Sequence, residues 1–172
     1  RGEIAVRIIR ACKELNIKTV AIHSNVDTEA MHVKLADESV CVGSALPNES
    51  YLNIPSIISA IDITGSDAVH PGYGFLSEND KFAKILSSHK VKFIGPTSKS
   101  ILELGNKSNA LKLASDFNLP ILGNKNSESL NKTSDAIKIA NEIGMPVVIK
   151  AAYGGGGKGM RVFNNTNEIG KY

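Results

Sequence analysis

The sequence lacks the features that mark several large classes of protein. No apolar stretch approaches the roughly 20 residues that a membrane-spanning helix needs, and no basic start followed by an apolar run predicts a signal peptide. It also contains no internal repeats and no low-complexity tract. These absences argue against a membrane protein or a repeat array. They favour a location in the cytoplasm, and a location in an organelle is the alternative.

The chain also has no large excess of positive or negative charge. The 20 Lys and Arg residues nearly balance the 17 Asp and Glu residues, and the formal net charge is only +3. The charges are spread along the chain without blocks, so no basic patch is available for a polyanion. We therefore expect neither a nucleic-acid partner nor a membrane-surface partner.

Cysteine is scarce as well. The only two, Cys12 and Cys41, lie in apolar runs 29 positions apart, with no C-x-x-C spacing and no histidine at a ligand spacing. This pattern is not that of a metal site or a disulfide framework. Both residues are predicted to be buried, reduced thiols.

What is present is an alternation of helical and strand-like segments. The apolar residues of the first segment fall on one helical face, and a short buried strand follows. The same analysis predicts strands at 18–24, 39–43, 67–70 and 91–95, and helices at 29–35, at 54–63 and after Ser77 as N-cap. Short apolar strands separated by helices indicate an α/β fold with one parallel sheet.

Composition and turn residues predict three parts in the 172-residue chain. Residues 1–95 form the sheet domain, residues 96–122 a helical linker, and residues 123–172 the start of a second domain. This second domain begins with a helix capped by Ser134 and the strand from Val147. Because the chain starts at Arg1 without methionine and stops where another helix begins, we expect it to be a fragment.

The segment from Gly154 to Gly159 contains five glycines in six positions. It satisfies G-x-G-x-x-G, but the segment that follows, MRVF, alternates like a strand, whereas a dinucleotide site needs a helix there. A P-loop would need lysine where Met160 stands. The remaining interpretation is a glycine flap between two strands whose N–H groups approach phosphates, with Lys150 directing a charge at them. A flexible hairpin with solvated lysines is the alternative.

Five motifs in order resemble biotin carboxylase, the ATP-dependent component of acetyl-CoA carboxylase that is related to domains of pyruvate and propionyl-CoA carboxylases. The motifs are RGEIAVRIIRACKEL, HPGYGFLSEN, FIGP, LGNK and IKAAYGGGGKGMRV. The resemblance spans the chain and implies a Rossmann-like N-terminal domain that precedes an ATP-grasp domain, whose lid begins near Gly123. It also implies a first strand just ahead of Arg1.

The resemblance assigns nucleotide contacts to six residues: Lys107, Lys150, Gly155, Gly156, Gly157 and Met160. It places Tyr73 of the HPGYG motif beside the biotin ring. It implies no catalytic residue and no metal ligand within these residues, because the carboxylates that hold Mg²⁺ belong to a later part of such enzymes.

The implied reaction uses ATP to activate bicarbonate and then carboxylates a carrier-bound biotin, which is the first half-reaction of acetyl-CoA carboxylase in fatty acid synthesis. The implied partners are a biotin carboxyl carrier protein, a carboxyltransferase component and a second copy of the chain. The fragment alone is expected to be inactive. Two alternatives stay open: another ATP-grasp ligase of the carbamoyl-phosphate synthetase type, and an inactive nucleotide-binding fragment.

Overall fold

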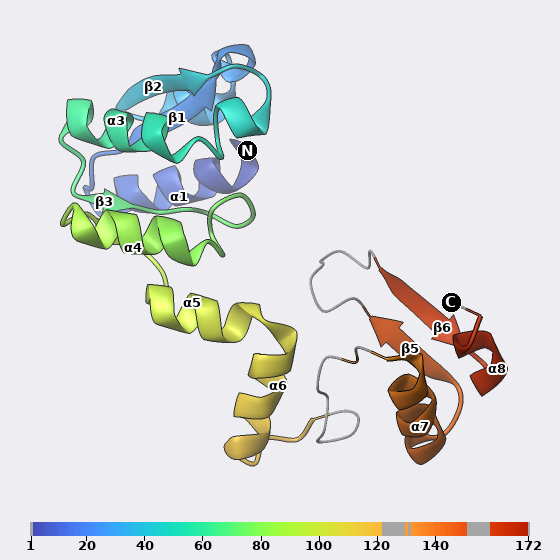
Figure 1. Cartoon of the computed structure of the whole chain (residues 1–172). Helices are drawn as coiled ribbons and strands as arrows, with labels where there is room; N and C mark the ends of the chain where they lie inside the picture. The colour runs from blue at the N-terminus through green and yellow to red at the C-terminus, as the bar shows by residue number, and fades with distance from the viewer. Residues whose placement is uncertain (1, 122–129, 131, 151–158, 172) are drawn as a thin grey trace. The chain divides into compact units, whose positions relative to one another are not determined.

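The computed structural model describes residues 2–121, 130, 132–150 and 159–171. The chain divides into two compact units, Arg1–Leu102 and Glu103–Tyr172 (Figure 1). The division falls within helix α5 (Ser98–Gly105). The three-part division at residues 95 and 122 stays a prediction.

The first unit alternates helices and strands, as the sequence predicts. It contains four α-helices before α5 and four strands among the described residues. In chain order these are α1 (Gly2–Glu14), β1 (Val20–Ser24), α2 (Met31–Leu35), β2 (Glu38–Gly43), α3 (Ile54–Thr64), β3 (Ala68–Val69), α4 (Asp80–Ser88) and β4 (Lys92–Phe93). Two short 3-10 helices, Asn25–Asp27 and Pro47–Glu49, lie in the connections.

The strands of the first unit form two parallel pairs. In one pair β1 runs beside β2, with Ile22 opposite Val40; in the other, β3 runs beside β4, with Val69 opposite Phe93. The parallel direction is as predicted, and among the described residues the strands form two separate pairs, because no described strand joins β1 to β3. Both β1 and β3 instead line a pocket, described below.

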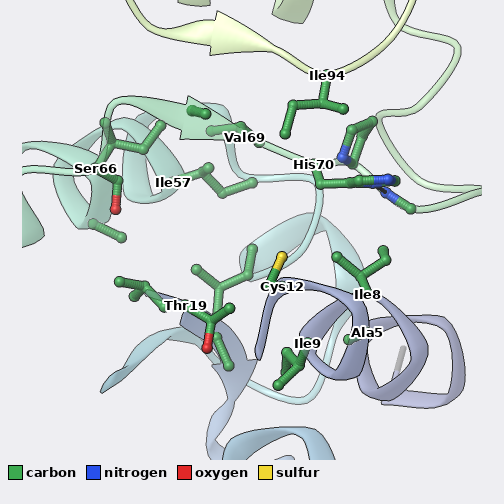
Figure 2. A pocket seen from close by; sticks show the side chains of 18 of the residues that line it. Ala5, Ile8, Ile9, Cys12, Thr19, Ile57, Ser66, Val69, His70 and Ile94 are labelled. Atoms are coloured by element: carbon green, nitrogen blue, oxygen red, sulfur yellow. Dashed lines mark hydrogen bonds between the residues drawn. The ribbon is translucent and has the colours of Figure 1, made fainter. Parts of the chain in front are cut away.

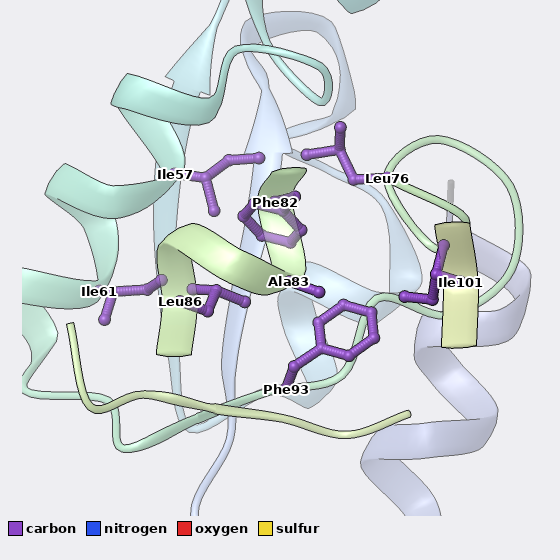
Figure 3. Packing of buried hydrophobic residues seen from close by; sticks show 8 residues of the cluster. All are labelled: Ile57, Ile61, Leu76, Phe82, Ala83, Leu86, Phe93 and Ile101. Atoms are coloured by element: carbon purple, nitrogen blue, oxygen red, sulfur yellow. The ribbon is translucent and has the colours of Figure 1, made fainter. Parts of the chain in front are cut away.

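The core of the first unit lies around helix α4. Phe82 and Leu86 of α4 are 2% and 0% exposed, and the rings of Phe82 and Phe93 meet edge to face at 6.2 Å. Figure 3 shows the buried side chains of this core: Ile57, Ile61, Leu76, Phe82, Ala83, Leu86, Phe93 and Ile101. Burial of each large side chain stabilises the fold by roughly 1.5–3 kcal/mol.

Helix α4 begins later than the sequence predicts. Its N-cap is Asn79, whose side-chain oxygen accepts a hydrogen bond from the Phe82 N–H at 2.8 Å. Ser77 instead lies in the preceding turn, where its N–H donates to the Gly74 carbonyl oxygen. The assignment of Ser77 as cap is therefore wrong, because the turn that starts at Gly74 extends through Glu78 before the helix begins.

The cysteines are free, as predicted, but only one is shielded. Cys12 is half-buried on α1, whereas Cys41 is exposed. On β2, Val42 faces the core and is 5% exposed, so the alternation of the strand turns its neighbour Cys41 outward. The prediction that both thiols are buried is wrong.

The second unit contains helices on both sides of a hairpin in the sequence. After α5 come α6 (Lys107–Asp116) and α7 (Thr133–Ile143), then strands β5 (Val147–Lys150) and β6 (Met160–Phe163) and helix α8 (Thr166–Ile169). Helix α7 has Lys132 as N-cap, without a side-chain cap hydrogen bond, so the assignment of Ser134 as its cap is wrong by two positions. Ala140, Phe163 and Ile169 form the small core of this unit.

Candidate functional site

The β5–β6 hairpin brings two of the predicted nucleotide contacts together. Its strands pair antiparallel, and Lys150 at the end of β5 stands opposite Met160 at the start of β6. Directly opposite residues of a ladder project their side chains to the same face of the sheet. The next pair on that face is Val148 and Val162. The hairpin thus presents one ammonium group beside a small apolar surface.

This face of the hairpin is open to solvent, whereas the opposite face is packed. Val147, Ile149 and Phe163 pack with the core residue Ala140 of α7. On the open face, Val148, Met160 and Val162 are 49%, 51% and 58% exposed. Lys150 is exposed as well. A ligand could therefore contact the apolar side chains and the Lys150 ammonium group of the open face while the core on the opposite face stays packed.

The glycine run lies between Lys150 and Met160 in the sequence. Gly155, Gly156 and Gly157 lie outside the described residues, so their predicted contacts with phosphates stay predictions. Gly159 is described, and its φ of +74° is in the region that glycine adopts more readily than other residues. The backbone that enters β6 is therefore in a conformation that favours glycine.

Lys107 lies on a separate element of the same unit. It is the first residue of α6, and its neighbour Asn106 is the N-cap, accepting hydrogen bonds from the N–H groups of Ser108 and Asn109. A lysine at this position opposes the helix dipole, whose N-terminal end favours negative charge. An anionic ligand at this end of α6 would relieve the conflict.

Tyr73 lies in the first unit, on the turn that follows β3. The turn is tight: Gly72, Gly74 and Phe75 have φ values of +67°, +78° and +43°. His70 stabilises it, because its Nδ1 accepts a hydrogen bond from the Gly72 N–H at 3.0 Å. Tyr73 is 65% exposed, and its hydroxyl donates a hydrogen bond to Glu3 of α1 at 2.7 Å. The turn therefore presents an aromatic ring to solvent from the carboxyl end of a parallel strand, where open α/β sheets bind ligands.

A buried polar network lies at the carboxyl end of β1. The Tyr51 hydroxyl donates to Asp27 at 2.6 Å and accepts from the Ser24 N–H at 3.0 Å, and the Ser24 hydroxyl also donates to Asp27 at 2.6 Å. Burial and the hydrogen bond to Asp27 raise the pKa of Tyr51. The Tyr51 ring stacks on Phe75 at 5.2 Å, which links this network to the Tyr73 turn. Nothing in the sequence pattern predicts this network.

A pocket of about 490 Å³ lies within the first unit, also without a signal in the sequence. Its walls come from α1, β1, α3, β3 and the start of the Tyr73 turn. Figure 2 shows that the labelled side chains around it are mostly apolar, among them Ile8, Ile9, Ile57 and Val69. Such a lining does not suit a triphosphate, which needs cations and N–H donors. The pocket is therefore separate in character from the hairpin surface.

The described residues contain neither a cluster of metal-binding side chains nor a helix that could span a membrane. They contain no group of three or more His, Cys, Asp or Glu side chains that could bind a metal ion. No described helix has the length and apolar character that crossing a membrane requires.

Comparison with known proteins places these features in a family. Residues 1–101 match the family described as "Biotin carboxylase, N-terminal domain". Residues 106–172 match "Carbamoyl-phosphate synthase L chain, ATP binding domain". The chain belongs to the biotin carboxylase family. The predicted resemblance and the predicted α/β fold followed by the start of an ATP-binding domain are confirmed.

Relatives in the family are similar over nearly the whole chain. The biotin carboxylase of Haemophilus influenzae is 49% identical over 169 residues, which are 98% of this chain and 38% of that protein. The mitochondrial propionyl-CoA carboxylase alpha chain of Caenorhabditis elegans is 49% identical over 168 residues, 98% of this chain and 23% of that protein. The chain thus spans well under half the length of these curated relatives.

Solved structures of the family have the same fold. A biotin carboxylase from Campylobacter jejuni, solved as a beta-gamma-ATP complex, has a TM-score of 0.93 and 45% identity, over 99% of this chain and 38% of that one. The biotin carboxylase domain dimer of Hydrogenobacter thermophilus 2-oxoglutarate carboxylase, solved in complex with MgADP, ADP and bicarbonate, has a TM-score of 0.92. Its identity is 42%, over 99% of this chain and 37% of that one.

Proposed function

We propose that this chain is the N-terminal part of a biotin carboxylase, an ATP-dependent ligase. The whole polypeptide would use ATP and bicarbonate to carboxylate a carrier-bound biotin. The observation that carries the proposal is the pairing of Lys150 with Met160 on the open face of the hairpin that brackets the glycine run. Family membership and the nucleotide complexes of the relatives support it.

The hairpin, the glycine run between its strands and the start of α6 would serve the nucleotide side of the reaction. Met160 would pack on the adenine base, because a half-exposed apolar side chain gains from covering an aromatic ring. Lys150 would place its ammonium near the phosphates, and the N–H groups of Gly155, Gly156 and Gly157 would approach the same oxygens. Lys107 would add a second cation from the start of α6. Charge that develops during phosphoryl transfer is stabilised by such fixed donors.

Two further parts of the proposal lie outside the hairpin. Tyr73 would pack beside the biotin ring, because the turn holds its exposed ring at the carboxyl end of β3. Mg²⁺ would neutralise phosphate charge, and the resemblance to biotin carboxylase assigns the carboxylates that hold it to a later part of the whole polypeptide.

The parent enzyme would act with partners. The solved 2-oxoglutarate carboxylase domain is titled as a dimer, and we propose that the whole polypeptide also pairs with a second copy. A biotin carboxyl carrier protein and a carboxyltransferase component would complete the system. Identity to the biotin carboxylase of Haemophilus influenzae and to the propionyl-CoA carboxylase of Caenorhabditis elegans is the same, 49%, so the assignment to acetyl-CoA carboxylase stays a prediction.

A ligase of the carbamoyl-phosphate synthetase type is the second candidate, favoured by the description matched at residues 106–172. One experiment separates the two. The full-length polypeptide is assayed for ATP hydrolysis with bicarbonate, with and without free biotin. Biotin-dependent turnover supports the proposal, whereas carbamoyl phosphate formed from bicarbonate and ammonia without biotin would overturn it. The 172-residue chain alone is expected to give no bicarbonate-dependent hydrolysis.

A further inference from the structure

The turn that carries Tyr73 packs directly on the first turn of α1. A Cβ atom on Gly72 would lie 3.0 Å from Cγ2 of Ile4, so the backbone of the turn and this side chain are in close contact. Gly72 also has a positive φ of +67°, which a larger residue rarely adopts. The absence of a side chain at Gly72 therefore allows the turn to approach α1 this closely. A small shift of α1 would displace the turn, and a shift of the turn would displace α1.

Glu3 reaches the same turn from α1. Its Oε2 accepts the hydrogen bond from the Tyr73 hydroxyl at 2.7 Å, across 70 positions of sequence. That hydrogen bond and the charge of Glu3 raise the pKa of Tyr73, and Arg7 acts in the opposite direction. Because Tyr73 is 65% exposed, packing covers only a minor part of its ring. The bond to Glu3 thus fixes the end of a side chain that packing covers only in part.

The other end of the turn is held separately. Phe75 stacks on Tyr51 with 18° between the ring planes, and Tyr51, 7% exposed, is anchored by Asp27 and Ser24. Phe75 is only two residues from Tyr73, so the backbone on this side of Tyr73 has little freedom. The freedom that remains is the rotation of the Tyr73 side chain itself, and the hydrogen bond that its hydroxyl donates to Glu3 restricts that rotation.

We propose that Glu3 is a positioning residue that holds the Tyr73 ring in the orientation needed to pack against biotin. This inference rests on the proposed function, in which Tyr73 contacts biotin. Glu3 does not touch the substrate. Its role is to remove the rotational freedom of Tyr73 before biotin binds, because ordering a side chain at the moment of binding lowers affinity.

The test in the full-length polypeptide compares the KM for free biotin with the KM for ATP. Glu3→Ala is expected to raise the KM for biotin by roughly 2- to 12-fold, the range for ordering one side chain, and to change the KM for ATP less than about twofold. Glu3→Gln, which keeps an acceptor oxygen, is expected to restore most of the loss. The matched control is Asp62→Ala, which removes an exposed carboxylate from α3.

A double-mutant cycle gives the sharpest outcome. If Glu3 acts through the Tyr73 hydroxyl, the double variant of Glu3→Ala and Tyr73→Phe has the same KM for biotin as either single variant. Additive increases would overturn the inference. Equal increases in the KM for biotin and in the KM for ATP would also overturn it. Equal increases would indicate a general loss of structure, whereas a loss of Tyr73 positioning should affect biotin binding alone.

A second arm keeps this inference distinct from the proposed function. Scalar couplings measured by NMR on the 172-residue chain at pH 7 report the χ1 rotamers of Tyr73 without any substrate. One dominant rotamer is expected in the wild type and in Glu3→Gln, and averaging among rotamers in Glu3→Ala. Averaging already in the wild type would overturn the positioning role. If the full-length polypeptide lacks biotin-dependent turnover while Tyr73 has one dominant rotamer, the proposed function is overturned. The claim that Glu3 positions Tyr73 for biotin is then overturned with it.

Discussion

Lys150 and Met160 occupy opposite positions of the β5–β6 ladder, so a cation and an apolar side chain share one open face. A carboxylate introduced at Met160 would lie within reach of the Lys150 ammonium, because directly opposite side chains of a ladder interact. The pair therefore provides a way to test whether the charge of Lys150 and the apolar surface beside it serve the same ligand.

Met160→Asp is expected to raise the KM for ATP of the full-length polypeptide by about tenfold or more, since it removes apolar contact with the base and neutralises the neighbouring cation. Met160→Leu keeps size and apolar character and is expected to change it less than about threefold. Because Met160 is 51% exposed, neither change should lower the thermal unfolding midpoint appreciably. Equal KM values for the two variants would contradict the assignment of Met160 to the base.

Tyr51→Phe tests the buried network at the end of β1. It leaves the ring stacked on Phe75 but removes the hydroxyl that bonds Asp27 and Ser24. The free energy of unfolding, measured with urea, is expected to fall by roughly 1–3 kcal/mol, because buried polar groups lose their partner. Tyr73→Phe is the matched control and is expected to change it by less than about 1 kcal/mol, as its hydroxyl is exposed. Equal losses for the two variants would mean that the network does not stabilise the fold.

His32 is expected to make the free energy of unfolding depend on pH. It is 3% exposed, and burial lowers its pKa below the ordinary value of 6.5. As the pH falls through 6.5, the His32 imidazole becomes protonated in the unfolded chain but stays neutral in the folded chain. The free energy of unfolding therefore decreases until the pH reaches the lowered pKa of the folded state. The wild type should therefore lose more stability than His32→Asn between pH 7.5 and pH 5.5. Parallel pH profiles of the two proteins would show that His32 is not responsible.

The sequence predicted most elements of the fold but not how distant elements pair. Periodicity gave the helix and strand alternation because each pattern is local, and alternation of MRVF correctly indicated a strand after the glycines. Pairing is not local: the pattern predicts parallel strands, but it does not say that among the described residues β1 pairs with β2 and β3 with β4. Caps were missed for the same reason, since the choice of Asn79 over Ser77 follows from a turn that the tertiary structure holds.

The candidate site shows the same division. Lys150 and Met160 could be predicted to lie together because a hairpin joins neighbouring segments of the chain. The hydrogen bond between Tyr73 and Glu3 spans 70 positions of the sequence, and the one between Tyr51 and Asp27 spans 24. A tyrosine or a carboxylate at such a position does not by itself indicate which distant residue it will contact. Polar contacts of this kind depend on the packing of whole elements, so they become visible only in the folded structure.

The most direct test of the central claim is the affinity of the full-length polypeptide for ATP, measured by isothermal titration calorimetry for wild type, Lys150→Ala and the control Lys138→Ala. Lys138 is an exposed lysine of α7 in the same unit. Loss of a charge-assisted contact with the phosphates should weaken ATP binding by roughly 10- to 150-fold in Lys150→Ala and leave Lys138→Ala within about twofold of the wild type. Unchanged ATP affinity in Lys150→Ala would contradict the claim that this hairpin binds the nucleotide.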